Sequence, residues 1–193
     1  MSRPPAPTDP SPSAAESGPG QSRNGHETPC ESGRFPTALI TGASPGIGAA
    51  FARRLAQQGS ALILTARRKD RLEALAELLQ HEYHIQVEVL DADLASPDGV
   101  NAAAQRLTAA PVDLLVNNAG LGIYRPLADT SEAKLMSRLQ PNVVALARLT
   151  HAALPEMIRR GSGTVINVAS GLAFNPSATR ATPTNWTALT IQP

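Results

Sequence analysis

The chain has 193 residues, with 17 Lys and Arg against 16 Asp and Glu, 42% hydrophobic and 3% aromatic residues, which suits one domain and not two. A net charge of +1 gives no basic footprint for nucleic acid, and no run approaches the roughly 18 apolar residues of a membrane-spanning helix. Neither nucleic acid nor a membrane is therefore an expected partner. The single cysteine, Cys30, and a start without a signal-like apolar core indicate a cytoplasmic location and no cysteine-rich metal site.

The composition changes sharply near Phe35 and divides the chain into three predicted parts. Residues 1–35 are rich in Pro, Ser and Gly and poor in branched apolar side chains, which predicts a disordered leader. Residues 36–176 carry the patterns of a folded dinucleotide-binding domain. Residues 177–193 show neither a helical nor a strand period, so we expect an irregular C-terminal segment.

From Pro36 onward, short apolar runs alternate with segments of helical period. A helix is expected after Gly48 to about Gln58, a second over residues 69–82, and a third behind the capping sequence Ser96-Pro97-Asp98. Strands are predicted at residues 37–41, 61–65, 85–90, 112–116 and 164–168. This alternation predicts an α/β fold with a doubly wound parallel sheet, incomplete on its C-terminal side.

A glycine-rich turn, Thr41 to Gly48, joins the first predicted strand to the first helix. Unpaired N–H groups and the positive end of the helix dipole meet there, which suits a diphosphate. Gly42 allows a tight turn, Gly46 removes a side chain where phosphate oxygens approach, and Gly48 allows close helix packing. An ordinary loop is the alternative, but the position between strand and helix favours a nucleotide site.

This turn, together with Asn117-Asn118-Ala119-Gly120, resembles the two motifs of the short-chain dehydrogenase/reductase family over about residues 36–176. The resemblance implies a Rossmann fold and a nicotinamide-dependent interconversion of a hydroxyl and a carbonyl on a small-molecule substrate. Asp93 and Leu94 would flank the adenine, although Asp93 also suits a turn. The implied cofactor-binding residues are Gly42, Ser44, Gly46, Ile47, Gly48, Arg67, Asp93, Leu94, Asn117, Ala119 and Gly120.

The end of the second strand indicates which nicotinamide cofactor is bound. An acid at this place would accept hydrogen bonds from the ribose hydroxyls of NAD. This chain instead reads Thr65-Ala66-Arg67-Arg68-Lys69, and arginines match the geometry of a phosphate. We therefore expect NADP rather than NAD. The alternative is a solvated helix start, which is less favourable because cations at a helix N-terminus oppose its dipole.

Two residues match the family's catalytic set, which consists of a serine, a tyrosine, a lysine and an asparagine. Ser170 follows the fifth predicted strand and matches the serine that hydrogen-bonds the substrate oxygen. Asn142 matches the asparagine that supports a proton-relay water. Because Pro141 precedes it, Asn142 could instead lie at a purely structural kink.

The family's Tyr-x-x-x-Lys pair has no match. Its positions fall on Pro183 and Thr187, and the only lysines of the chain are Lys69 and Lys134. Tyr124 is a poor substitute because a tyrosine without a lysine keeps a pKa near 10. The sequence therefore resembles a C-terminally truncated or altered reductase with impaired turnover.

Two alternatives follow from these departures: a non-catalytic dinucleotide-binding or interaction protein, and an unstable fragment of a reductase. A homo-oligomer is possible, but the helix that carries much of the dimer contact in the family has no counterpart in this sequence.

Overall fold

The computed structural model describes residues 35–44, 46–122 and 129–169. Within these ranges five parallel strands form one sheet in the order β3-β2-β1-β4-β5. This is the predicted doubly wound arrangement, with β3 and β4 beginning two residues later than expected. The strands are β1 (Thr37–Thr41), β2 (Ala61–Ala66), β3 (Val87–Asp91), β4 (Leu114–Asn117) and β5 (Thr164–Asn167).

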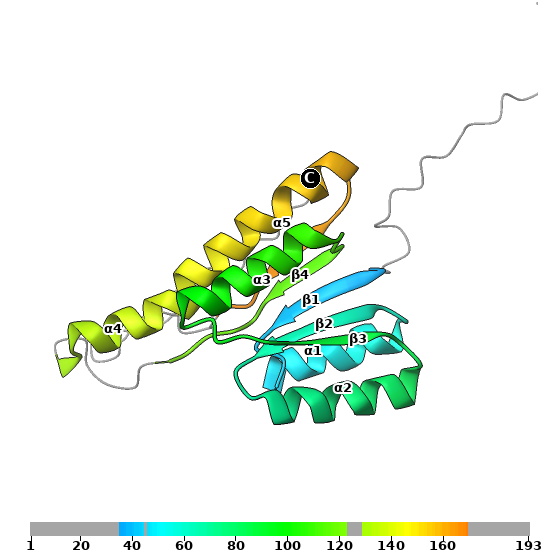
Figure 1. Ribbon diagram of the computed structural model, residues 1–193, viewed down its shortest axis with the longest axis horizontal. Helices are drawn as coiled ribbons and strands as arrows, with labels where there is room; N and C mark the ends of the chain where they lie inside the picture. The colour runs from blue at the N-terminus through cyan, green and yellow to red at the C-terminus, as the bar shows by residue number, and fades with distance from the viewer. Residues whose placement is uncertain (1–34, 45, 123–128, 170–193) are drawn as a thin grey trace, which may run out of the picture.

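Helices cover both faces of the sheet (Figure 1). α1 (Gly46–Gln57) and α2 (Lys69–Tyr83) pack on one face, and α3 (Pro97–Ala109) and α5 (Leu146–Arg160) on the other. Each face has its own apolar cluster, and alternate strand residues point into one or the other: Ile40 joins the α1 and α2 side, and Leu39 the α3 and α5 side. The continuous apolar runs of the strands arise from this burial on both faces.

Local sequence signals fix the helix ends. Ser96 caps α3 as predicted: its hydroxyl accepts a hydrogen bond from the Gly99 N–H at 3.1 Å, and Pro97 occupies the first helical position. α5 ends at Gly161, whose φ of 65° gives the left-handed conformation that closes many helices.

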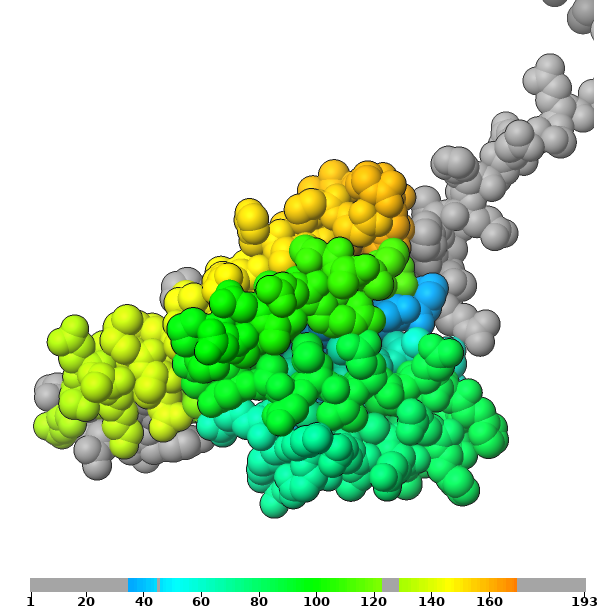
Figure 2. All heavy atoms as spheres, viewed as in Figure 1, coloured from blue at the N-terminus to red at the C-terminus, as the bar shows by residue number. Residues whose placement is uncertain are grey.

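A change of helical register precedes α5. α4 (Glu132–Leu139) leads into the π-helix η2 (Gln140–Ala145), which leads directly into α5. Pro141 lies in η2 and cannot donate a helical hydrogen bond, which accounts for the irregularity that the sequence predicted at this place. α4 projects beyond the sheet at the far end of this helical run (Figures 1 and 2).

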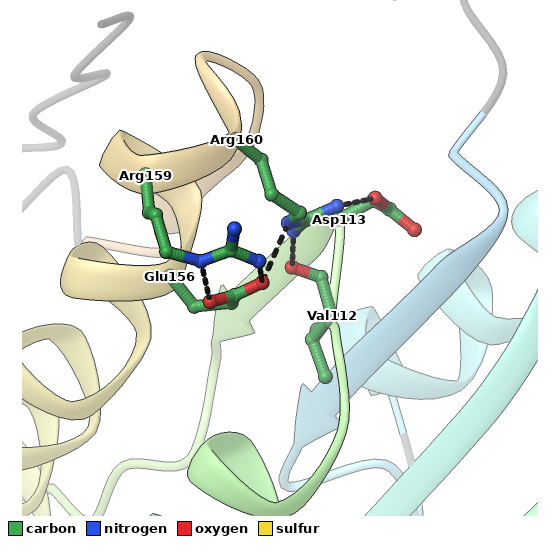
Figure 3. A network of polar contacts seen from close by, with 5 residues as sticks. All are labelled: Val112, Asp113, Glu156, Arg159 and Arg160. Carbon is green, nitrogen blue, oxygen red and sulfur yellow. Dashed lines mark hydrogen bonds and ion pairs between the residues drawn. The ribbon is translucent and has the colours of Figure 1, made fainter.

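A polar network fastens the other end of α5 to the sheet (Figure 3). The Arg160 guanidinium donates to an Asp113 carboxylate oxygen at 2.7 Å and to the Val112 carbonyl at 3.0 Å. The second Asp113 oxygen accepts from the Thr37 N–H at 3.0 Å, so the network reaches the amino end of β1. α5 is thus anchored at the edge of the sheet opposite the carboxyl ends of the strands.

In the three described ranges, no helix combines the length and the apolar character required to cross a membrane.

Candidate dinucleotide-binding site

A cleft of about 390 Å³ opens at the carboxyl ends of the strands. β1 lies between β2 and β4, so the connections build the sheet first on one side of β1 and then on the other. Open α/β sheets bind ligands at such a switch point. The cleft is lined by the end of β2, the start of α1, the segments that follow the strands and one residue of η2: Gly42, Ser44, Ile47, Ala66, Arg67, Arg68, Ala92, Asp93, Leu94, Ala95, Asn118, Ala119, Gly120, Leu121 and Pro141.

The glycine turn brings the start of α1 against the end of β1. Gly42 has a φ of 67°, and its N–H donates to the Thr65 carbonyl at 2.7 Å. A Cβ at Gly48 would collide with the Gly42 carbonyl oxygen and the Asn118 side chain, so only glycine allows this approach. A Cβ at Gly46 would meet nothing within 4 Å. The first turn of α1 carries no acid, which leaves the positive helix end available to an anion.

The Thr41 hydroxyl joins this turn to the segment after β4. It accepts hydrogen bonds from the Asn118 and Ala119 N–H groups, both at 2.9 Å, and donates to the Val116 carbonyl at 3.3 Å. The Asn118 side-chain amide donates in return to the carbonyls of Thr41 and Gly42 at 3.0 and 3.1 Å. Thr41 is only 1% exposed, so these bonds form in a dry environment that strengthens them.

A basic wall closes the side of the cleft next to β2. Arg67 and Arg68 are exposed and both line the cleft. An Arg68 guanidinium nitrogen donates to the Ser44 hydroxyl oxygen at 3.4 Å, so the segment after β2 contacts the segment after β1 at this wall. Arg68 is also the N-cap residue of α2, and its side chain does not cap the first N–H groups of that helix.

Asp93 performs the turn-forming role that the sequence left open. Its carboxylate accepts from the Ala95 N–H at 3.0 Å, and its carbonyl accepts from the Ser96 N–H and hydroxyl, both at 2.9 Å. Leu94 is buried beside it and contributes an apolar surface to the cleft.

Asn142 and Asn117 lie behind the lining rather than in it. The Asn142 amide accepts from the Leu121 N–H at 2.8 Å and donates to the Leu121 carbonyl at 3.0 Å, which holds the segment after β4 against η2. Asn117 is 4% exposed and donates to Thr150 and Asn167. Both side chains are therefore engaged with protein groups around the site.

The structure brings eight of the predicted cofactor residues into the cleft lining: Gly42, Ser44, Ile47, Arg67, Asp93, Leu94, Ala119 and Gly120. Gly46 and Gly48 belong to the same turn without lining the cleft. Ser170, Tyr124, Pro183 and Thr187 lie outside the described residues. Sequence reasoning included Arg68 only in the run of cations that would face the 2′-phosphate, and it assigned no role to Thr41 or to the Asn118 side chain, although both belong to the motifs that it quoted.

Across the described part of the chain, no group of three or more His, Cys, Asp and Glu side chains could hold a metal ion.

These observations define a Rossmann-type α/β fold with a cleft at the carboxyl ends of its strands. The family model described as short chain dehydrogenase matches residues 36–182. Sulfoacetaldehyde reductase 2 of Chromohalobacter salexigens is 40% identical over 136 residues, which are 68% of this chain and 53% of that protein. The chain thus spans about half the length of the curated relatives it matches.

Two solved structures have the same fold. A short-chain dehydrogenase from Sphingobium yanoikuyae in complex with NADPH superposes with a TM-score of 0.74 at 38% identity, covering 76% of this chain and 57% of that one. L-Sorbose reductase from Gluconobacter frateurii, complexed with NADPH and L-sorbose, gives a TM-score of 0.71 at 33% identity, covering 77% and 57%. The chain belongs to the short-chain dehydrogenase/reductase family.

Proposed function

We propose that the protein binds NADP(H) in this cleft, with the diphosphate at the start of α1 and the 2′-phosphate against the basic wall. The observation that carries the proposal is the convergence of Arg67, Arg68 and the Ser44 hydroxyl on one side of the cleft, where no carboxylate lines the wall after β2. Guanidinium and hydroxyl donors suit a phosphate, whereas the ribose hydroxyls of NAD would favour an acid.

The relatives support the choice of cofactor. The Sphingobium dehydrogenase and the Gluconobacter reductase were both solved with NADPH. Their similarity to this chain extends over about three quarters of its length, 76% and 77% respectively. The same cofactor is therefore the expected ligand here.

The reaction class is the interconversion of a hydroxyl and a carbonyl on a small molecule. A bound nicotinamide would supply or accept the hydride. Asn142 would hold the segment from Ala119 to Leu121 that borders the cofactor, through its two hydrogen bonds to Leu121. Ser170 would donate a hydrogen bond to the substrate oxygen, the role that the family resemblance assigns to it.

We expect turnover by this chain to be absent or very weak. Pro183 and Thr187 stand where the family has the proton-donating tyrosine and the lysine that lowers its pKa. Cofactor binding without turnover is the second candidate function. The sulfoacetaldehyde and L-sorbose reductases named above favour an oxidoreductase ancestry for that binding. We propose that the protein is located in the cytoplasm, in keeping with its single cysteine.

Calorimetric titration with NADPH and NADH tests the binding proposal. We expect micromolar affinity for NADPH and clearly weaker binding of NADH. A folded protein that binds neither nucleotide would contradict the proposal. NADPH oxidation measured over a panel of aldehydes and ketones separates the two candidates: slow oxidation supports an impaired oxidoreductase, and no oxidation supports cofactor binding alone. Ordinary reductase rates would show that the expected defect is wrong.

A further inference from the structure

Three polar side chains from three different elements meet beneath the cleft. The Asn117 side-chain amide, at the end of β4, donates one hydrogen bond to the Thr150 hydroxyl of α5 at 3.1 Å and one to the Asn167 carbonyl oxygen of β5 at 2.9 Å. Asn117 and Asn167 are also partners in the register of the two strands. We refer to Asn117, Thr150 and Asn167 as the polar triad.

Stability alone gives a poor account of this arrangement. The Asn117 side-chain oxygen is buried and has no hydrogen-bond partner among the described residues, while its NH₂ group uses both of its hydrogens. A half-satisfied buried amide costs free energy that an apolar side chain of similar size would not. Elements that break local rules in this way concentrate where geometry serves function.

The triad lies where the supports of the cofactor cleft begin. The chain leaves Asn117 directly into Asn118 and Ala119, whose N–H groups bond to Thr41, and reaches Leu121, which Asn142 holds. Asn142 belongs to η2, which continues directly into α5, the helix of Thr150. On the other strand, the Val168 N–H donates to the Asn117 carbonyl at 2.9 Å. The Asn117 side-chain amide therefore links the end of β4 both to α5, through Thr150, and to β5, through Asn167.

We infer that Thr150 is a positioning residue of the cofactor site. Its hydroxyl oxygen fixes the orientation of the Asn117 amide and, through it, the direction in which residues 118–121 leave the sheet. Without this acceptor the amide loses its link to α5, and the segment from Asn118 to Leu121 loses its alignment with Thr41 and Asn142. The effect on the cofactor rests on the proposed function, whereas the effect on the segment does not.

Two variants of Thr150 and one control test the inference. Thr150→Val keeps the shape and removes the acceptor, and Thr150→Ser keeps the hydroxyl. The control is Thr108→Val: Thr108 is exposed on α3, and its hydroxyl donates only to the Gln105 carbonyl of the same helix at 2.9 Å. The first readout is amide hydrogen exchange without nucleotide. The Asn118, Ala119 and Leu121 amides are informative because each has a defined acceptor.

In Thr150→Val we expect these three amides to exchange roughly tenfold faster, the effect of leaving one buried donor unpaired. Exchange in α1, on the opposite face of the sheet, should stay unchanged. Thr150→Ser and Thr108→Val should resemble the parent protein. Unchanged exchange at residues 118–121, or an equal rise throughout the sheet and α5, would overturn the inference.

The second readout is the dissociation constant for NADPH, expected to rise roughly tenfold in Thr150→Val and to recover in Thr150→Ser. Local opening of residues 118–121 with unchanged NADPH affinity would overturn the link to the cofactor site. If the parent protein binds no NADPH while Thr150→Val still opens residues 118–121, the proposed function fails and the positioning of the segment is upheld.

Discussion

Arg68 differs from its neighbour Arg67 because the structure gives it a partner across the cleft, the Ser44 hydroxyl at 3.4 Å. A phosphate placed between the two groups would receive a hydrogen bond from each. We expect Arg68→Ala to weaken NADPH binding by about tenfold to a hundredfold, since a hydrogen bond from a charged group contributes about 1.5–3 kcal/mol. NADH lacks the 2′-phosphate, so the affinity of the protein for NADH should stay almost unchanged.

Calorimetry with both nucleotides measures this selectivity. Arg71→Ala is the matched control, because Arg71 is exposed in the first turn of α2 and does not line the cleft. If Arg68→Ala weakened the binding of both nucleotides equally, the arginine would act on the shared part of the cofactor and its assignment to the 2′-phosphate would be wrong.

At the scale of single residues, the sequence predicted the motifs better than the hydrogen-bonding roles of individual side chains. The glycine pattern located the turn, because only glycine tolerates the close approach at Gly48. Thr41 escaped notice because a threonine at a strand end is unremarkable until its two N–H partners are known to come from the segment after β4. Thr150 escaped for the same reason: its partner Asn117 lies 33 residues away.

At the scale of elements, the predicted alternation of strands and helices is confirmed because local signals and burial agree. The Ser96 cap and the apolar runs each imply the element that is observed, and in α2 the buried leucines are Leu72, Leu75 and Leu79, spaced three and four residues apart. A kink at Pro141 was the alternative that the sequence left open for Asn142. That it takes the form of a π-helix with the buried Asn142 turned toward Leu121 depends on contacts between η2 and the segment after β4, which no local pattern encodes.

Near the end of α5, the ion pairs of Glu156 should make the stability of the fold depend on pH. A hydrogen bond from Arg159 lowers the pKa of Glu156 from its usual value of 4.5, and the charges of Arg159 and Arg160 act in the same direction. The carboxylate therefore stabilises the fold above its unfolded pKa, and this contribution is lost as the pH falls through the lowered folded value. We expect Glu156→Gln to melt at a slightly lower temperature than the parent at pH 7.

The difference between the two proteins should shrink as the pH is lowered below the pKa of the folded carboxyl, because the parent then also lacks the charge. Thermal melts of both proteins at pH 7 and in acid measure it, and a second series in high salt should reduce the gap at pH 7. A gap that stays constant from pH 7 into acid would show that the glutamate acts through packing rather than through its charge.

At the scale of the whole molecule, Phe35 is the first residue that the structure describes, and it contacts the packed body. Phe35 is half-buried against the apolar cluster beneath α1 and α2, and the Pro36 carbonyl accepts from the Ala61 N–H at 2.9 Å. Composition predicts that residues 1–35 form a leader and residues 36–176 the dinucleotide-binding domain. From the contacts of Phe35 we propose that this residue belongs to the folded domain rather than to the leader.

Deletion of residues 1–34 tests this division of the chain. We expect a cooperative melt with a midpoint within about 2 °C of the full chain, because nothing in the composition of that segment supports a buried core.

Phe35→Ala in the shortened protein should lower the midpoint by several degrees, roughly 1–2 kcal/mol for a half-buried aromatic side chain. NADPH at about a thousand times its dissociation constant should stabilise the full and shortened chains equally, by about 4 kcal/mol. A broad, non-cooperative transition in the full chain would instead favour the unstable fragment, and a large loss on deleting residues 1–34 alone would show that the leader takes part in the fold.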